Sequence, residues 1–352
     1  KALTDEESDA LERGFPVLVH GMHKQVATTG FLKPDDETAT AEVTLVVPEK
    51  RRPELTQLEV RFAPSLVGSM LDALPYCLDY PYGCTEQTMS RFLPAVLVRR
   101  ALARSGADPE AMESRIFGNE GGRKLDDVTR KGIRRLADMQ HGNGSWGWWK
   151  ESSDDPFMTA YVIWGLAEAA DAGIRFDDSM LKRAAAWLDT RLVESEERPD
   201  DQAWLLHALA AANAVTGEKA SRLQKDAFAN LFQRRERLNA YTRALLTLTA
   251  FRFGETGKGQ VLVRNLSNGV IRNDGTAHWG NDGIRYRWSN GGVEATAFAL
   301  RALLAADPEH ELVDPTVRWL VNNRRGARWS NTRDTAIAVM AIASPRLVER
   351  FG

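Results

Sequence analysis

A cysteine and a glutamine stand three positions apart in the segment Gly83-Cys84-Thr85-Glu86-Gln87, where a helix is predicted to begin. Residues at this spacing share one face of a helical turn, so the thiol of Cys84 and the carboxamide of Gln87 can touch. Attack of the thiolate on the amide carbon would expel ammonia and leave an internal thioester, an acyl group open to an external nucleophile. Gly83 lets the backbone bend tightly ahead of the helix. The helix N-terminus is expected to lower the pKa of the Cys84 thiol.

A small buried cysteine beside a solvated glutamine is the plain alternative, and for an isolated Cys-x-x-Gln it would be the better interpretation. The residues just before the pair, and the rest of the chain, favour the thioester. A thioester hydrolyses in water unless apolar side chains exclude it, so four nearby residues are predicted to shield the pair. These are Tyr80, Tyr82, Met89 and Phe92.

The composition is that of an ordinary soluble globular protein. Of the 352 residues, 43% are hydrophobic and 27% are charged, which fits one large domain or one large and one small. A net charge of −2 gives no reason to expect nucleic acid or an acidic membrane as a partner. Two cysteines cannot make a disulfide framework, and the thioester interpretation leaves Cys77 as an unpaired core thiol. None of the six histidines is spaced from a cysteine as a metal pair would be, so no metal site is expected.

Residues 1–64 carry strand signals. Alternating runs rich in β-branched residues occupy 39–48 and 55–62, and prolines separate them. Three or four strands form a sheet that is too small to bury much alone. We therefore expect this segment to belong to a larger β domain, only part of which lies in the chain.

From residue 65 to 352 the periodicity is helical, and alanine-rich apolar helices alternate with charged amphipathic ones. The predicted apolar helices are 84–98, 156–169, 201–215, 239–252, 292–305 and 332–343; the charged ones are 126–140, 178–193, 219–235, 258–266 and 313–323. Arg-Trp-Ser-Asn precedes two apolar helices, at 287–290 and 328–331. A unit of about 40 residues with two helices indicates a repeat architecture. Apolar helices inside and charged ones outside predict an α/α toroid of six helical hairpins, with an open superhelix as the competitor.

Acidic residues stand at several of the predicted helix starts. Asp155-Pro156, Asp307-Pro308 and Asp314-Pro315 each place a side-chain acceptor and then a proline where a helix should begin. Capping also explains four pairs that an enzyme could otherwise use as acids and bases. The pairs are Asp126-Asp127, Asp154-Asp155, Asp177-Asp178 and Asp200-Asp201.

The motif and the predicted fold together resemble the thioester domain of the alpha-2-macroglobulin and complement family. Its pattern Gly-Cys-x-Glu-Gln is matched at all four fixed positions, 83, 84, 86 and 87. Segments 144–148, 158–162, 293–300 and 315–320 are similar to a turn and helices of that family, and the lead-in 80–83 looks more like the bacterial members. The family's domain is a toroid inserted in a β domain of the CUB type. The resemblance thus accounts for residues 1–64 as part of that β domain, and it implies a larger parent protein.

The resemblance implies a single-use protease inhibitor, not an enzyme with turnover. Cleavage of a bait region elsewhere would expose the thioester, and a lysine of the protease would attack the Gln87 acyl carbon and release Cys84. Glu86 is assigned only as a structural or electrostatic neighbour. Some members relay the acyl group through a histidine, but the loop 193–200, where it would sit, has none.

The implied partners are target proteases and other domains of the parent chain, with no cofactor and no nucleic acid. The implied location is the periplasm, the cell envelope or the exterior, with membrane contact only through a lipid anchor outside this chain. Two rival functions remain open. One is a toroid enzyme, terpene cyclase-like or glycan-processing, which needs acids that converge on a cavity; Trp146, Trp148 and Trp149 could give it a carbohydrate platform, although we expect them to plug a turn. The other is an interaction module without covalent chemistry.

Overall fold

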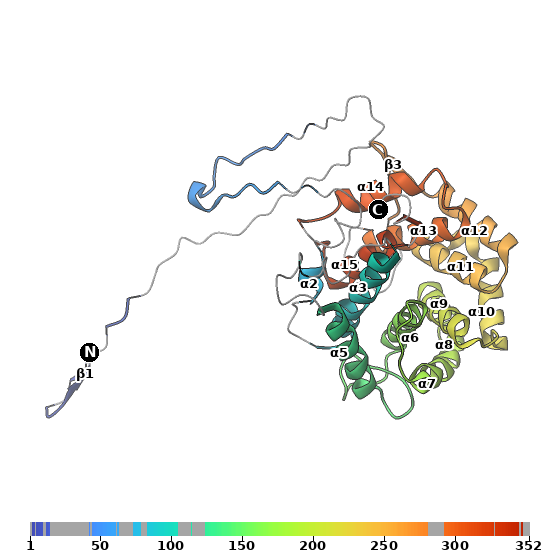
Figure 1. Ribbon diagram of the computed structural model, residues 1–352, viewed down its shortest axis with the longest axis horizontal. Coiled ribbons are helices and arrows are strands. Elements are labelled where there is room, and N and C mark those ends of the chain that lie inside the picture. The colour runs from blue at the N-terminus through green and yellow to red at the C-terminus, as the bar shows by residue number, and fades with distance from the viewer. Residues whose placement is uncertain are drawn as a thin grey trace.

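A ring of helices dominates the structure, a computed structural model (Figure 1). The residues that it describes are 2–3, 5–9, 12–14, 42, 44–60, 62, 73–78, 83–104, 114, 124–280, 292–326, 328–344 and 346–347. Among them, no helix is long and apolar enough to cross a membrane.

Six inner helices pack side by side around a common axis. They are α3 (Thr85–Arg104), α6 (Pro156–Asp171), α9 (Pro199–Thr216), α11 (Ala240–Arg252), α13 (Val293–Ala306) and α15 (Thr332–Ile342). Each packs against the next, and α15 packs against α3, so that the last inner helix lies beside the first (Figure 1). This closure confirms the predicted α/α toroid and excludes the open superhelix. All six predicted apolar helices are present, and only their ends differ.

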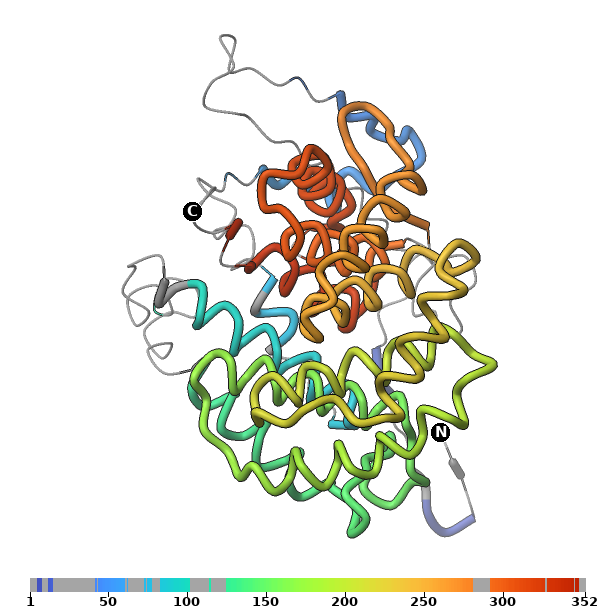
Figure 2. The backbone as a smooth tube through the Cα atoms, turned by 90° about the vertical axis from the view of Figure 1, so that its right-hand side faces the viewer, coloured from blue at the N-terminus to red at the C-terminus, as the bar shows by residue number. Residues whose placement is uncertain are grey.

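The outer helices alternate with the inner ones along the chain (Figure 2). They are α5 (Lys124–Met139), α7 (Asp178–Asp189), α10 (Arg222–Gln233), α12 (Thr256–Asn268) and α14 (Val313–Asn322), with the short helices α2 (Leu74–Leu78) and α8 (Arg191–Glu194) and the 3₁₀ turn η2 (Arg235–Arg237). The helix predicted over 178–193 is divided in two at Thr190, which separates α7 from α8. Each outer helix buries one stripe against the inner ring and exposes the other, as its amphipathic sequence requires.

Inner helices are apolar on all sides because neighbours surround them. In α6, every residue from Phe157 to Ala169 is buried. Small residues at the contacts let the backbones approach. A Cβ on Gly165 of α6 would lie 2.1 Å from the methyl carbon of Met89 on α3. Because these helices are buried on every side, their sequences are alanine-rich and apolar instead of amphipathic.

Three tryptophans repeat one arrangement at the entry to an inner helix. Each is buried, and its indole N–H donates to a carbonyl of the preceding outer helix, while its backbone N–H donates to a threonine of the inner helix that follows. The sets are Trp146 with Leu136 (2.7 Å) and Thr159 (2.9 Å), Trp279 with Leu266 (2.9 Å) and Thr296 (3.0 Å), and Trp329 with Leu320 (2.9 Å) and Thr335 (3.1 Å). The structural counterpart of Trp329 is therefore Trp279, whereas Trp288, which the repeated Arg-Trp-Ser-Asn pointed to, lies outside the described residues.

Helix caps confirm one of the three Asp-Pro predictions. Asp155 accepts hydrogen bonds from the backbone N–H groups of Phe157 (2.8 Å) and Met158 (3.0 Å) and begins α6. Asp307 instead follows the end of α13, and α14 begins at Val313, two positions before Pro315. Asp307 accepts a hydrogen bond from the Glu309 N–H (2.9 Å) in a turn, so Asp307-Pro308 marks a turn instead of a helix start. Asp314-Pro315 lies inside the first turn of α14, where proline is tolerated because the N–H groups have no partner within the helix.

The N-terminal segment contains less sheet than its sequence pattern suggests. A two-stranded pair joins β1 (Ala2–Leu3) and β2 (Ser8–Asp9), while residues 44–60 are exposed and hold only the 3₁₀ turn η1 (Pro53–Leu55). The strand expected over 55–62 is thus absent from its described part. An alternating pattern forms a strand only where a neighbour pairs with its backbone groups. The strand expected over 39–48 is absent from its described part too, since residues 42 and 44–48 are exposed and carry no strand. The boundary at residue 64 stays a prediction.

Candidate functional site

Cys84 and Gln87 lie together at the start of α3, where they form a capping box. The Cys84 carbonyl accepts the first hydrogen bond of the helix, from the Thr88 N–H at 2.9 Å, so Cys84 occupies the N-cap position. The Gln87 N–H donates to the Cys84 sulfur (N···Sγ 3.4 Å), and the Cys84 N–H donates to Gln87 Oε1 (3.3 Å). This is the reciprocal pattern of a capping box, with a thiol in place of the usual hydroxyl. Helix capping itself therefore brings the thiol to the carboxamide.

Gly83 makes room for an arginine from a distant helix. Its carbonyl accepts hydrogen bonds from Nε (3.2 Å) and Nη2 (2.6 Å) of Arg135 on α5. A Cβ on Gly83 would lie 2.3 Å from that Nη2, and the φ of Gly83 is not in the left-handed region. A side chain at position 83 would therefore require the guanidinium, the end of an exposed side chain, to shift. The tight bend expected ahead of the helix stays a prediction, since residues 79–82 lie outside the described residues. Sequence reasoning missed Arg135 altogether.

The turn at 144–148 anchors the first residue of α3. The backbone N–H of Thr85 donates to the Trp148 carbonyl (2.9 Å), and its hydroxyl donates to the Gly147 carbonyl (2.6 Å). Trp148 is held in turn by its indole N–H, which donates to Asp155 (3.1 Å). The segment that looked like a family turn thus lies directly against the reactive pair.

Glu86 connects α3 to a neighbouring inner helix. Its side chain is only 6% exposed, and Oε1 accepts hydrogen bonds from the hydroxyls of Ser90 (2.6 Å) and Thr332 (3.1 Å). Ser90 also lies 3.3 Å from the hydroxyl of Tyr161 on α6. Because Thr332 is the first residue of α15, Glu86 joins the first and last inner helices. Its expected role as a neighbour of the thioester stays a prediction.

The environment of Cys84 reverses the expected pKa shift. Burial raises the pKa of the Cys84 thiol above its ordinary value, and the nearby Glu86 carboxylate adds to the rise, while the Gln87 N–H acts in the opposite direction. The helix N-terminus therefore does not produce a low-pKa thiol, because desolvation of the thiolate outweighs the N–H group. Cys77 is also buried, its pKa is raised to about 12 mainly by burial, and neither cysteine is in a disulfide.

The four predicted shielding residues fall into two groups. Tyr80 and Tyr82 lie outside the described residues. Met89 and Phe92 are fully buried and face the helices beside α3, Met89 at Gly165 of α6 and Phe92 at Gly132 of α5. Both belong to the toroid core, and their role as shields stays a prediction. Gln87 itself is half-buried.

A buried ion pair, also missed from the sequence, lies one residue beyond Thr332. Arg333 is fully buried and donates to Glu294 of α13 at 2.6 and 3.2 Å. Three aromatic rings surround its guanidinium, with centroids 4.4 Å (Tyr161), 4.8 Å (Phe157) and 5.1 Å (Trp204) away. A desolvated cation of this kind is stable only because the carboxylate and the ring faces replace its water.

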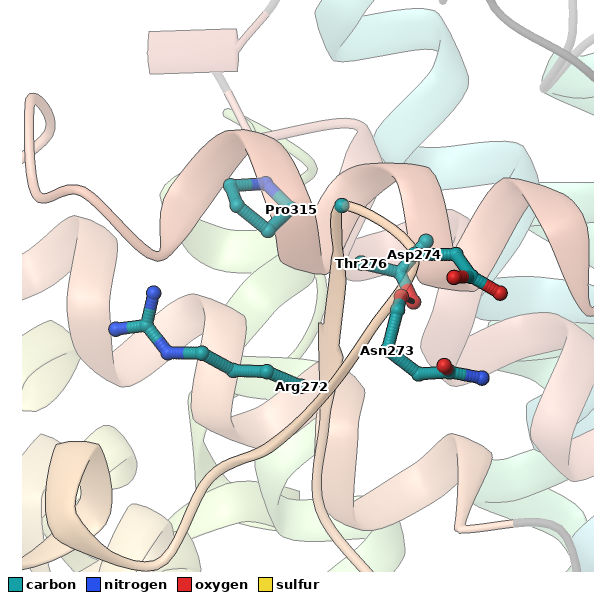
Figure 3. Close-up of a pocket in the computed structure, with 6 residues that line it drawn as sticks. Arg272, Asn273, Asp274, Thr276 and Pro315 are labelled. Carbon is teal, nitrogen blue, oxygen red and sulfur yellow. Dashed lines mark hydrogen bonds between the residues drawn. The ribbon is translucent and has the colours of Figure 1, made fainter.

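Three of the aspartates that a rival enzyme could have used as acids or bases have structural partners. Asp155 and Asp177 cap helices, and Oδ1 of Asp154 lies within hydrogen-bond distance of Nδ1 of His141, at 2.6 Å. Trp146 is a buried plug, whereas Trp149 is 55% exposed. A pocket lies at the hairpin of β3 (Ile271–Asn273) and β4 (Thr276–His278). The side chains that line it do not point toward one centre, since Arg272 points away from Asn273 and Asp274 (Figure 3). No group of three or more metal-ligating side chains occurs among the described residues.

Comparison with known proteins adds a family and several relatives. A family model described as the A-macroglobulin TED domain matches residues 63–195 and 202–344. An alpha-2-macroglobulin of Thermotoga maritima is 36% identical over 129 residues, which cover 37% of this chain and 7% of that protein. Thioester-containing protein 1 (allele R1) of Anopheles gambiae is 24% identical over 356 residues, which cover 96% of this chain and 25% of that protein. The chain thus spans a quarter or less of the length of these relatives.

Two solved structures share the fold. Native alpha-2-macroglobulin from Escherichia coli, from domain MG7 to the C-terminus, superposes with a TM-score of 0.56 at 19% identity over 81% of this chain and 42% of that one. Salmonella alpha-2-macroglobulin reacted with methylamine gives a TM-score of 0.56 at 21% identity over 78% of this chain and 17% of that one.

Proposed function

The chain belongs to the A-macroglobulin TED domain family, and on this premise we propose that Cys84 and Gln87 form an internal thioester that is used once. The observation that carries the proposal is the capping box, in which the side chain of each residue accepts a hydrogen bond from the backbone N–H of the other. A capping box needs only hydrogen bonds, so the precursor geometry is available as soon as α3 forms.

Formation of the thioester is an acyl transfer within one helical turn. The Cys84 sulfur attacks Cδ of Gln87, an S–C bond forms, and the C–N bond of the carboxamide breaks. The nitrogen leaves as ammonia and carries away the thiol proton. Negative charge develops on Oε1 during this step, and the Cys84 N–H already donates to that oxygen. Such preorganised donors lower the barrier because they need no reorganisation as the charge appears.

Reaction of the thioester with an amine, which releases Cys84, follows the same path with a different nucleophile. An amine attacks the same carbon, the C–S bond breaks, and Cys84 leaves as a thiolate that takes up a proton. A high thiol pKa makes a poorer leaving group, so the burial that raises the pKa of Cys84 favours a long-lived thioester. Cys84 is only 5% exposed, and this burial also favours a long-lived thioester.

In the whole protein, we propose that the thioester traps proteases. Lysine amines of a protease that has cut the parent chain would be acylated by Gln87, which makes the protein an inhibitor instead of a catalyst with turnover. The bacterial alpha-2-macroglobulin relative supports this role, and a place in the periplasm, at the cell envelope or outside the cell would bring such a protein to its targets. Contacts with other domains of the parent chain would control access to the site.

Intact mass tests the bond directly. The mass of the purified protein should be lower than the sequence mass by one ammonia, and Cys84 should show no reactive thiol. Treatment with methylamine should then add one molecule of methylamine and release a free thiol. Cys84→Ala and Gln87→Ala should each carry the full sequence mass, whereas Cys77→Ala, which alters the other buried cysteine, should still form the bond. A wild-type protein with free Cys84 and an intact Gln87 amide from the moment it folds would exclude the thioester.

A further inference from the structure

A single peptide group connects Arg135 to the carboxamide of Gln87. The carbonyl of Gly83 and the N–H of Cys84 belong to the same peptide unit, which is planar and trans, since no described peptide bond is cis. In a trans peptide the C=O and N–H point in opposite directions. Arg135 binds the oxygen end at 2.6 and 3.2 Å, and Gln87 Oε1 binds the N–H end at 3.3 Å.

We propose that Arg135 is a positioning residue for the thioester reactions: by holding the Gly83 carbonyl, it aims the Cys84 N–H at Gln87 Oε1, where negative charge develops. This inference rests on the proposed thioester and assigns a residue outside the Gly-Cys-x-Glu-Gln motif to its chemistry. Arg135 touches neither reacting side chain and acts through the peptide group.

Two physical effects give the contact its influence. Two N–H donors from one rigid guanidinium restrict rotation of the peptide plane, so the N–H stays directed at Oε1. A positive charge on the carbonyl oxygen also polarises the peptide and strengthens its N–H as a donor, since linked hydrogen bonds reinforce one another. Both effects are larger in the tetrahedral intermediate than in the starting state, because Oε1 is then an oxyanion.

The glycine at position 83 fits the same assignment. A Cβ there would stand 2.3 Å from Nη2 of Arg135, so the guanidinium, at the end of an exposed side chain, would have to shift to make room. Gly83→Ala should therefore have the same consequence as the loss of Arg135. The effects of the two substitutions on the coupling rate should not be additive in the double variant, since each removes the same contact.

A purely structural clamp predicts the opposite kinetic sign. If Arg135 only fastened the loop over the site, its loss would expose the thioester and speed its reaction with small nucleophiles. If it positions the oxyanion donor, its loss slows both formation and methylamine coupling. Complete removal of an oxyanion donor lowers rates by about 100-fold to 1,000-fold, and because the Cys84 N–H remains present, we expect a smaller decrease, about 10-fold.

The test compares methylamine coupling, followed by intact mass and thiol release, in four single variants and one double variant of the full chain. Arg135→Ala should couple about 10-fold more slowly, Arg135→Lys should recover part of the rate through one remaining donor, and Gly83→Ala should match Arg135→Ala alone and in combination. Arg134→Ala is the matched control, because Arg134 is an exposed arginine of the same helix and its loss removes the same charge. It should couple at the wild-type rate.

A spectroscopic measurement separates positioning from general damage. The chain has two cysteines, so ¹⁵N-cysteine labelling gives two backbone amide signals, which Cys77→Ala assigns. In Arg135→Ala the Cys84 amide proton should shift upfield as its hydrogen bond weakens, and the Cys77 signal should stay in place. Unchanged or faster coupling in Arg135→Ala, or a slower rate with an unmoved Cys84 signal, would overturn the inference alone. A wild-type protein without a thioester would overturn it together with the proposed function.

Discussion

The buried pair of Arg333 and Glu294 should be worth several kcal/mol to the toroid, and truncation of one partner tests this. The side chain of Arg333 is 1% exposed and that of Glu294 is 12% exposed, so neither charge can be solvated in place of its partner. Arg333→Met keeps much of the apolar stem that lies among the rings of Phe157, Tyr161 and Trp204 but removes the charge.

The expected loss follows from the carboxylate that is left behind. Removal of one partner from a buried ion pair costs about 3–5 kcal/mol, because the other charge stays desolvated. The lost contacts of the guanidinium with three ring faces add to this, at about 0.5–2 kcal/mol for such an interaction. Replacement of both partners by apolar residues costs far less, so Arg333→Met with Glu294→Leu should recover most of the stability.

Urea unfolding, monitored by circular dichroism, gives the free energy of each variant in a double-mutant cycle. The matched control is Arg272→Met, which breaks the exposed pair of Arg272 with Glu311, where the side chains are 58% and 72% exposed. That change should cost under about 1 kcal/mol. A similarly small cost for Arg333→Met, or a double variant as unstable as the sum of the singles, would refute the reasoning.

Three further predictions concern nucleophile choice, the tryptophan repeat and pH. Methylamine coupling should accelerate from pH 7 to pH 9 while glycerol stays inert, because an alkyl amine with a pKa of about 10.4 attacks only after losing its proton; efficient formation of a glycerol ester at pH 7 by mass spectrometry would reveal a relay base. Trp329→Phe should destabilise the fold in urea by about 1–3 kcal/mol, since the Leu320 carbonyl loses its indole donor. Trp279→Phe should cost less, because the Leu266 carbonyl keeps the Gly269 N–H as a donor; a larger cost for Trp279→Phe would contradict this reasoning. Burial, reinforced by Arg252 and Arg301, holds the pKa of His207 well below its ordinary value. The unfolded chain therefore binds a proton first as pH falls below about 6.5, and stability is lost on the acid side; His207→Gln should flatten this loss in urea midpoints measured from pH 7 to pH 5.

Properties that depend on neighbours in sequence could be predicted without the structure. The alternation of apolar and charged helices follows from periodicity within each segment, and the six inner helices begin and end close to the predicted positions. The contact of Cys84 with Gln87 is also local, since a capping box joins positions three apart by construction. For the same reason the cap at Asp155 was predicted correctly.

Properties that depend on contacts between different helices could not. Arg135 is 52 residues from Gly83, and Thr332 is 246 residues from Glu86, yet both reach the segment that carries the reactive pair. The arrangement of Trp279 differs from what the repeated tetrapeptide suggested, because the contact is set by where an outer helix and an inner helix meet. The strand expected over 55–62 failed for a related reason, since a strand needs a partner that local pattern cannot supply.

The sequence by itself determined the contact between Cys84 and Gln87 and the helices around it, because helix capping and amphipathic periodicity act over three or four residues. Tertiary structure alone decided the sign of the pKa shift of Cys84, the space required at Gly83 and the arginine that fills it. The physical reason is that desolvation and long-range hydrogen bonds depend on which helices surround a residue. Around Cys84 those neighbours come from the following helix, as Arg135 does, and from the last inner helix, as Thr332 does.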